Sequence, residues 1–230
     1  ALLERARAQL PQAEIIVVDD GSTDATPAIL DAFSGVYVLH HRRNLGKGAA
    51  IRTGLAAASG RIVLVQDADL EYDPADYPTL LAPFKEEGVE AVYGYRRHMI
   101  SLAEYLGRLR DAEGGLGPRL FAHWSYFAGA QALGWIMRLR YGACPRDPFT
   151  GYKVFRTETL RSLALARDGF DFCGEATCRL LARRVPIVDV PIHYAPRSFL
   201  EGKKLRARDG FRMLRTILRE ARRRRPREAR

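Results

Sequence analysis

One short stretch limits most strongly what this chain can fold into. The apolar run 62–65 is followed at once by Gln66-Asp67-Ala68-Asp69-Leu70-Glu71. Such a run is typical of a buried parallel strand, and an ionised Asp at its end is disfavoured unless it is paired or bound to a cation. Two carboxylates spaced Asp-x-Asp can share one divalent cation that also holds a diphosphate. On these residues alone, an ordinary acidic turn is an equal alternative.

Strand-like and helix-like segments alternate around this stretch. Strands are predicted at 14–20, 36–40, 62–65 and 90–95. Helices are predicted at 2–10, 24–33 and 74–87, and an Ala-rich helix follows Gly48 and ends near Gly60. This alternation predicts an α/β fold with a mostly parallel sheet and helices on both faces.

The charge of the chain is concentrated at its C-terminal end. The net charge is +10, and residues 203–230 carry 13 Lys or Arg against 3 Asp or Glu, so residues 1–202 are balanced. A basic segment of this kind favours an anionic surface, either phospholipid headgroups or nucleic acid, and a solvated helix end is the alternative. The three cysteines fit neither a disulfide framework nor a zinc ligand set, which favours a reducing compartment.

Several motifs recur in order and at characteristic spacing. They are Asp19-Asp20-Gly21-Ser22-Thr23-Asp24, Asn44-x-Gly46-Lys47-Gly48-x-x-x-Arg52-x-Gly54, the Gln66 to Tyr72 segment, Thr150-Gly151-Tyr152-Lys153 and Pro191 to Lys204. In these motifs the chain resembles family 2 glycosyltransferases of the GT-A fold. Within that family it is similar to the polyprenyl-phosphate sugar transferases, the subgroup of dolichol-phosphate mannose synthase.

The resemblance implies a set of site residues. Those expected to bind the nucleotide sugar are Asp20, Lys47, Asp67, Ala68, Asp69 and Lys203. The ligands expected for Mg²⁺ or Mn²⁺ are Asp67, Asp69 and Glu71. The acceptor phosphate is expected at Arg96, Arg97 and Arg197, and the residues implied for catalysis are Asp69, Arg96 and Arg197.

Simpler readings stand beside three of these roles. Asp20 could cap the following turn, Lys47 could lie on a solvated helix face, and Lys203 could be the start of the basic segment. Two further acids, Asp147 and Glu175, could each act as a general base if the acceptor were a hydroxyl group.

The beginning of the chain departs from the family pattern. Members normally start with a strand followed by a Pro-x-Tyr-Asn-Glu segment, and this sequence begins about where the next helix would end. We expect the first strand to be missing from the printed sequence rather than from the protein. The catalytic domain is predicted at 1–204, and a basic C-terminal helix at 205–230.

A weakly polar helix is predicted at about 119–141. Residues 120–137 carry no formal charge, but polar and small residues interrupt the run, and a spanning helix needs about 20 mostly apolar residues. One helical face holds Phe121, Trp124, Ala128, Ala132, Trp135 and Leu139. We interpret it as an amphipathic helix that lies on the membrane, with packing in the core as the alternative.

The resemblance therefore implies an inverting, metal-dependent hexosyltransferase acting on a polyprenyl monophosphate. GDP-mannose is the favoured donor and UDP-glucose the second. The protein is expected to be cytoplasmic and peripheral on an anionic membrane surface, with no nucleic-acid partner. Two rivals remain: transfer to a saccharide hydroxyl on the same fold, and a non-catalytic membrane-associated domain.

Overall fold

The computed structural model describes residues 1–96, 116–195 and 207–223 of the chain. The predicted boundary between 204 and 205 lies outside these residues. All four predicted strands are confirmed, although each is shorter than or equal to its predicted length.

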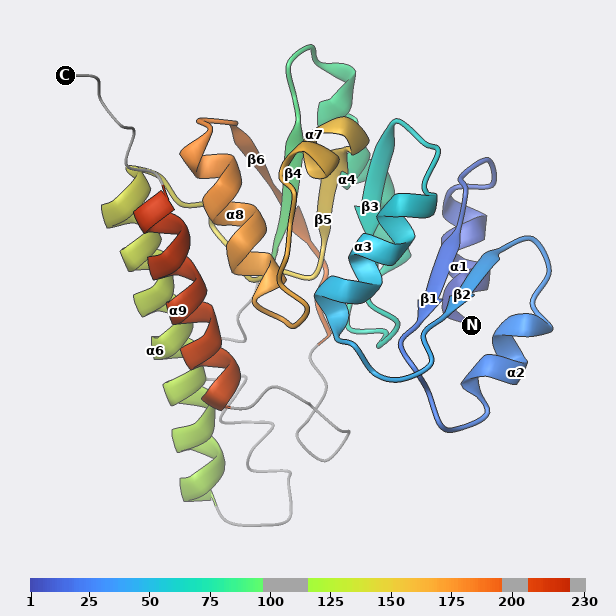
Figure 1. The fold of residues 1–230 in the computed structure, drawn as a ribbon, viewed down its shortest axis with the longest axis horizontal. Coiled ribbons are helices and arrows are strands. Elements are labelled where there is room, and N and C mark those ends of the chain that lie inside the picture. The colour runs from blue at the N-terminus through green and yellow to red at the C-terminus, as the bar shows by residue number, and fades with distance from the viewer. Residues whose placement is uncertain (97–115, 196–206, 224–230) are drawn as a thin grey trace.

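A two-stranded parallel sheet comes first. Strand β1 (Ile16–Asp19) pairs with β2 (Tyr37–His40), and Ile16 lies opposite Tyr37. Helix α1 (Leu2–Gln9) precedes these strands and α2 (Thr26–Asp31) connects them. Figure 1 shows this part of the molecule at the right of the view.

The larger sheet has four strands in the order β3 (Ile62–Val65), β5 (Lys153–Arg156), β4 (Ala91–Arg96) and β6 (Ile187–Ile192). Strand β5 runs antiparallel to both of its neighbours, whereas β4 and β6 are parallel. The predicted α/β fold is confirmed, but the sheet is mixed rather than mostly parallel. The difference comes from β5, which the sequence pattern did not identify as a strand because only Val154 and Phe155 form its apolar part.

Helices cover both faces of the larger sheet (Figure 1). One core contains Tyr93 and Phe155 of the sheet and residues from α7 (Thr157–Ser162) and α8 (Phe172–Ala182), with α3 (Lys47–Ala57) packed against it. The opposite core joins Val92 and Val154 to α1 and to α4 (Tyr77–Leu81). Burial of these apolar side chains is the main stabilising contribution.

The predicted helix at 74–87 is divided into three short pieces. They are η1 (Pro74–Asp76), α4 and η2 (Ala82–Lys85). Pro78 and Pro83 lie at the first turns of α4 and η2. Proline has no backbone N–H to donate and restricts the residue before it, which explains the interruptions.

Two long helices pack at one end of the larger sheet. Helix α6 (Leu116–Tyr141) contributes Met137 to the core, and α9 (Ala207–Arg223) contributes Met213 and Ile217. On the predicted apolar face of α6, Trp135 and Leu139 are 60% and 79% exposed. For these two residues the alternative of core packing is wrong. Within the described residues, no helix combines the length and hydrophobicity needed to cross a membrane.

The strand directions bring several chain segments to one edge. Strands β3, β4 and β6 end there, and antiparallel β5 begins there, since Lys153 lies opposite both Val65 and Tyr93. Helix α3 begins beside the same edge, because Lys47 contacts Asp67 just after β3. Ligands of open α/β sheets bind at such edges.

The close approach of α3 to the backbone at Arg167 gives a test of this packing. A Cβ atom at Gly48 would lie 2.0 Å from the Arg167 carbonyl oxygen. Gly48→Ala should therefore lower the free energy of unfolding by about 2 kcal/mol. Urea denaturation followed by circular dichroism measures the change.

Gly210 in α9 is the matched control, because a Cβ atom there would meet no atom within 4 Å. Gly210→Ala should raise the free energy of unfolding by about 0.5–1 kcal/mol, since alanine favours the helix. Equal effects of the two substitutions would contradict the close packing of α3.

Candidate active site

The turn after β3 carries the Asp-x-Asp motif. Asp67 and Asp69 are half-buried, and Ala68 between them is exposed. The backbone N–H of Glu71 donates to Asp69 Oδ1 at 3.2 Å. Leu70 has φ of 60°, a left-handed conformation that is costly for a residue with a side chain.

Residues on both sides hold this strained turn in place. The backbone N–H of Ala195 donates to the Glu71 carbonyl oxygen at 2.9 Å. The backbone N–H of Gly151 donates to the Tyr72 hydroxyl at 2.8 Å. A Cβ atom at Gly151 would lie 2.6 Å from Asp67 Oδ2, so only glycine fits between the motif and Tyr72.

Glu71 is buried below the turn. The Tyr194 hydroxyl donates to Glu71 Oε2 at 3.1 Å. Glu71 also lines a cavity of about 580 Å³, together with Leu70, Asp73, Asp76, His193 and Tyr194 among others. No group of three His, Cys, Asp or Glu residues converges as a metal site within the described part of the chain. A role for Glu71 as a third ligand stays a prediction.

The two aspartates of the motif still fit a divalent cation. Mg²⁺ is usually bound through one or two carboxylates together with substrate phosphates, rather than by a complete protein cage. Asp67 and Asp69 supply that number of carboxylates, next to an exposed residue and at the edge where strands end.

Lys47 reaches the motif from the first turn of α3. Its Nζ lies 2.6 Å from Asp67 Oδ2, and its side chain is 16% exposed. Burial alone lowers the pKa of Lys47, but the attraction of Asp67 keeps that pKa above its ordinary value. The alternative of a solvated helix face is wrong for this residue. Its role with the nucleotide sugar stays a prediction.

Asp20 holds the loop that leads into α3. Its carboxylate accepts backbone N–H groups from Leu45 at 2.8 Å and Gly46 at 2.7 Å, and contacts His41 Nδ1 at 2.7 Å. Burial raises the pKa of Asp20, but these hydrogen bonds bring it below its ordinary value. The turn at Ser22 is instead held by Asp19, whose carboxylate accepts the Ser22 N–H at 3.0 Å.

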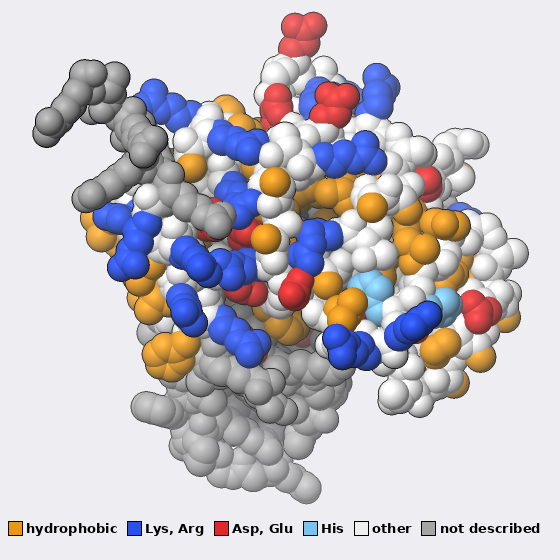
Figure 2. Space-filling view, in the orientation of Figure 1, with side chains coloured by type: hydrophobic (Ala, Val, Ile, Leu, Met, Phe, Trp, Pro, Cys, Tyr) orange, Lys and Arg blue, Asp and Glu red, His pale blue; other side chains and the backbone are white. Residues whose placement is uncertain are grey.

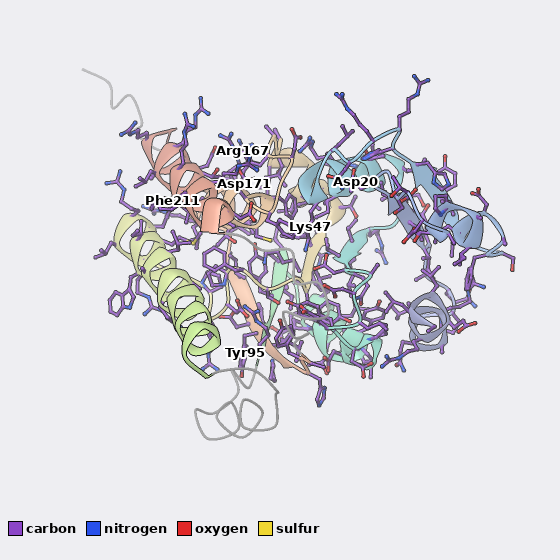
Figure 3. All side chains as sticks on the ribbon, turned by 90° about the horizontal axis from the view of Figure 1, so that it is seen from below. Asp20, Lys47, Tyr95, Arg167, Asp171 and Phe211 are labelled. Carbon is purple, nitrogen blue, oxygen red and sulfur yellow. The ribbon has the colours of Figure 1, made fainter. Side chains whose placement is uncertain are left out.

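A second loop fixes α3 from the other side. The carbonyl oxygen of Asp168 accepts N–H groups from Gly48 at 2.6 Å and Ala49 at 3.2 Å. The Arg52 guanidinium donates to the Arg167 carbonyl oxygen at 2.7 Å and also to the Asp168 carboxylate. In Figure 3, Asp20, Lys47 and Arg167 lie on the same side of the molecule, where α3 begins.

Glu175 anchors that second loop. Its side chain is fully buried, and Oε2 accepts N–H groups from Ala166 and Arg167, each at 2.9 Å. Its other oxygen lies 2.7 Å from the Arg179 guanidinium. Because these groups occupy the carboxylate inside the core, Glu175 is a structural residue and does not fit the role of general base.

Arg96 ends β4 beside the motif. Its Nε and Nη2 donate to the two oxygens of Asp147 at 2.6 and 3.0 Å, a bidentate pair, and its guanidinium lies 5.0 Å above the Tyr194 ring. Burial lowers the pKa of Arg96, but Asp147 keeps it well above its ordinary value. The sequence predicted a role for Arg96 and a possible one for Asp147, but it did not predict that the two residues pair. Arg97, Arg197 and Lys203 lie outside the described residues.

Lys153 is a further cation at this edge that the sequence did not single out for a role. It is fully buried, donates to the Thr150 carbonyl oxygen at 2.5 Å and lies 4.4 Å above the Tyr93 ring. Burial lowers the pKa of Lys153. Lys153 closes the Thr150-Gly151-Tyr152-Lys153 motif, which was a signal, but its burial could not be predicted because β5 was not predicted as a strand.

Comparison with known sequences identifies the family. The family model described as Glycosyl transferase family 2 matches residues 1–144. The chain belongs to glycosyltransferase family 2. This membership makes the protein a glycosyltransferase and sets aside the non-catalytic alternative.

Several relatives act on polyprenyl phosphates according to their names. Dolichyl-phosphate beta-glucosyltransferase of Drosophila melanogaster is 33% identical over 89% of this chain and 62% of its own length. Undecaprenyl-phosphate mannosyltransferase of Micrococcus luteus is 28% identical over 87% of this chain and 79% of its own. Dodecaprenyl-phosphate galacturonate synthase of Rhizobium johnstonii is 33% identical over 37% of this chain, which corresponds to only 27% of the relative.

Solved structures confirm the fold. Glucosyl-3-phosphoglycerate synthase of Mycobacterium tuberculosis in complex with UDP matches with a TM-score of 0.67 and 23% identity, over 96% of this chain and 76% of that chain. The same enzyme with Mn²⁺, UDP-glucose and phosphoglyceric acid matches with a TM-score of 0.64.

The structural role of Glu175 can be tested directly. Glu175→Gln should lower the free energy of unfolding by about 3 kcal/mol, because Arg179 loses its buried charged partner. Glu158→Gln, at an exposed position of α7, should change it by less than about 0.5 kcal/mol. Thermal and urea unfolding measure both.

The same variant tests the chemistry of transfer. The folded Glu175→Gln protein should keep the pH profile of sugar transfer of the parent. If the variant kept the stability of the parent but lost the basic limb of the pH profile, the structural role would be contradicted. Glu175 would then again be a candidate general base.

Proposed function

We propose that this chain catalyses the inverting, metal-dependent transfer of a hexose from a nucleotide sugar to a polyprenyl monophosphate. The main support is the pair of relatives from Drosophila and Micrococcus, which align with nearly the whole chain and carry the names of polyprenyl-phosphate sugar transferases. The whole activity remains a proposal because the chain spans 62% of the first of these relatives.

The donor would bind where β1, β3 and α3 meet. Asp67 and Asp69 would hold Mg²⁺ or Mn²⁺, and the cation would neutralise negative charge on the departing diphosphate. Asp20 would lie on the nucleoside side, as the family resemblance implies, and it also fixes the loop before Lys47. Ala68 would allow the donor close to the motif, and Lys203 would add positive charge.

The acceptor would be held by cations rather than activated by a base. A phosphate monoester is already anionic near neutral pH, so positioning and charge neutralisation suffice. Arg96 would contribute to its binding with Arg97 and Arg197, while Asp147 keeps the Arg96 guanidinium oriented. The burial of Glu175 and the pairing of Asp147 with Arg96 both favour such an acceptor over a saccharide hydroxyl.

GDP-mannose remains the favoured donor, and UDP-glucose is the second. The names of the relatives include mannose, glucose and galacturonate, so they do not choose between these donors. UDP-glucose also appears in the bound complex of the Mycobacterium enzyme.

The protein would act on the cytoplasmic surface of an anionic membrane. Among the residues of α9 whose side chains are described, the exposed arginines are Arg212, Arg215, Arg219 and Arg222. Phe211 and Leu218 on the same helix are 74% and 41% exposed. Figure 2 shows basic side chains gathered over this part of the molecule. Arginines mixed with exposed apolar side chains suit a lipid surface, where the charges meet headgroups and the apolar groups enter the interface.

A donor and acceptor screen on the complete protein tests the proposed reaction. Transfer from GDP-mannose or UDP-glucose to a short polyprenyl phosphate should require Mg²⁺ or Mn²⁺ and stop in excess chelator. Asp67→Asn and Asp69→Asn should each reduce transfer at least about 100-fold without unfolding the protein, since the leaving diphosphate loses stabilisation. Full activity of the parent in chelator, or faster transfer to a free sugar hydroxyl, would overturn the proposal.

Vesicle sedimentation tests the membrane surface. Arg219→Glu combined with Arg222→Glu should weaken binding to phosphatidylglycerol vesicles by about 2 kcal/mol or more, roughly 30-fold, because each basic residue contributes about 1 kcal/mol. The control pair, Arg61→Glu with Arg184→Glu, changes exposed arginines elsewhere and should have a smaller effect. Equal losses for both pairs would indicate a nonspecific effect of net charge.

A further inference from the structure

Lys47 has an unusual position for a lysine. It is the first residue of α3, and the N-terminal end of a helix carries partial positive charge. An ammonium group there is not favoured by the helix itself. Its stabilising partner is instead Asp67, whose Oδ2 lies 2.6 Å from Nζ.

The backbone around Lys47 is fixed on both sides. The N–H groups of Leu45 and Gly46 donate to Asp20, and those of Gly48 and Ala49 donate to the Asp168 carbonyl oxygen. These four N–H groups are therefore not available to a phosphate. At this end of α3, the Lys47 side chain can change its partner while the backbone stays in place.

The ammonium group and a divalent cation compete for the same carboxylate. Metal–oxygen distances for Mg²⁺ are about 2.0–2.1 Å, so a cation bound to Asp67 Oδ2 would lie close to an ammonium 2.6 Å from that oxygen. The two positive charges repel each other, and each draws on the negative charge of the same carboxylate. The metal and the Lys47 ammonium therefore weaken each other's interaction with Asp67.

We propose that Lys47 is an internal counter-ion of Asp67, displaced by the divalent cation and then paired with the diphosphate of the nucleotide sugar. This inference rests on the proposed function, because it needs a metal at Asp67. It assigns Lys47 a second task besides donor binding: it weakens metal binding until a diphosphate is present. Metal and nucleotide then strengthen each other's binding, as linkage requires.

Manganese titration of the complete protein, followed by the electron paramagnetic resonance signal of free Mn²⁺, tests this idea without measuring activity. Lys47→Met removes the charge with little change in length. Without nucleotide it should bind Mn²⁺ about tenfold more tightly than the parent, since a charge-assisted contact no longer competes. Adding UDP or GDP should tighten Mn²⁺ binding less in this variant than in the parent.

Two controls separate charge from other effects. Lys47→Arg keeps a positive group for Asp67 and should bind Mn²⁺ as weakly as the parent. Lys85→Met makes the same substitution at an exposed position of η2 and should leave Mn²⁺ binding unchanged. If Lys47→Met fails to fold by circular dichroism, Lys47→Gln provides the neutral side chain.

The outcomes distinguish this inference from the proposed function. Equal or weaker Mn²⁺ binding by a folded neutral variant overturns the counter-ion role, even where the parent binds Mn²⁺ through Asp67. A parent protein whose Mn²⁺ binding is unaffected by Asp67→Asn overturns the metal site of the proposed function, and this inference with it.

Discussion

The buried carboxylate of Glu175 fixes a backbone loop, and that loop fixes the helix that carries Lys47. Glu175 accepts the N–H groups of Ala166 and Arg167, and the next carbonyl oxygen along the chain accepts those of Gly48 and Ala49. A carboxylate can be buried this way only because Arg179 and the backbone donors compensate for its desolvation. The geometry around Lys47, on the proposed donor side of the site, therefore depends on a residue that is buried in the core.

Among the described residues at this edge of the sheet, two cations are each paired with an aspartate. Lys47 is paired with Asp67 and Arg96 with Asp147, while Lys153 is buried against a carbonyl oxygen and the Tyr93 ring. A divalent cation and a diphosphate largely compensate each other's charge, so they can enter together at lower electrostatic cost than either alone. Such pairing would let a site rich in arginine and lysine accept the proposed metal together with the diphosphate.

Much of the fold could be predicted from the sequence because local signals agreed there. Apolar runs marked β1 to β4, and acidic residues at strand ends located the Asp-x-Asp turn. What could not be predicted depended on contacts between distant residues. Arg96 and Asp147 are 51 residues apart, and Arg52 reaches a loop 115 residues away. Likewise, the composition of 205–230 predicted a basic helix but gave no sign that Met213 and Ile217 would enter the core.

Gln66 shows how narrowly the residues behind the motif are specified. Its amide oxygen accepts the hydroxyl groups of Tyr77 at 3.0 Å and Tyr152 at 2.6 Å, and its amide nitrogen donates to the Asp67 carbonyl oxygen at 2.7 Å. Deamidation to glutamate would keep the acceptor but turn the donor into a second oxygen facing that carbonyl group. Deamidation of Gln66 would therefore displace the Asp67 backbone. A protein sample could lose activity in this way while its overall fold and its mass remain almost unchanged.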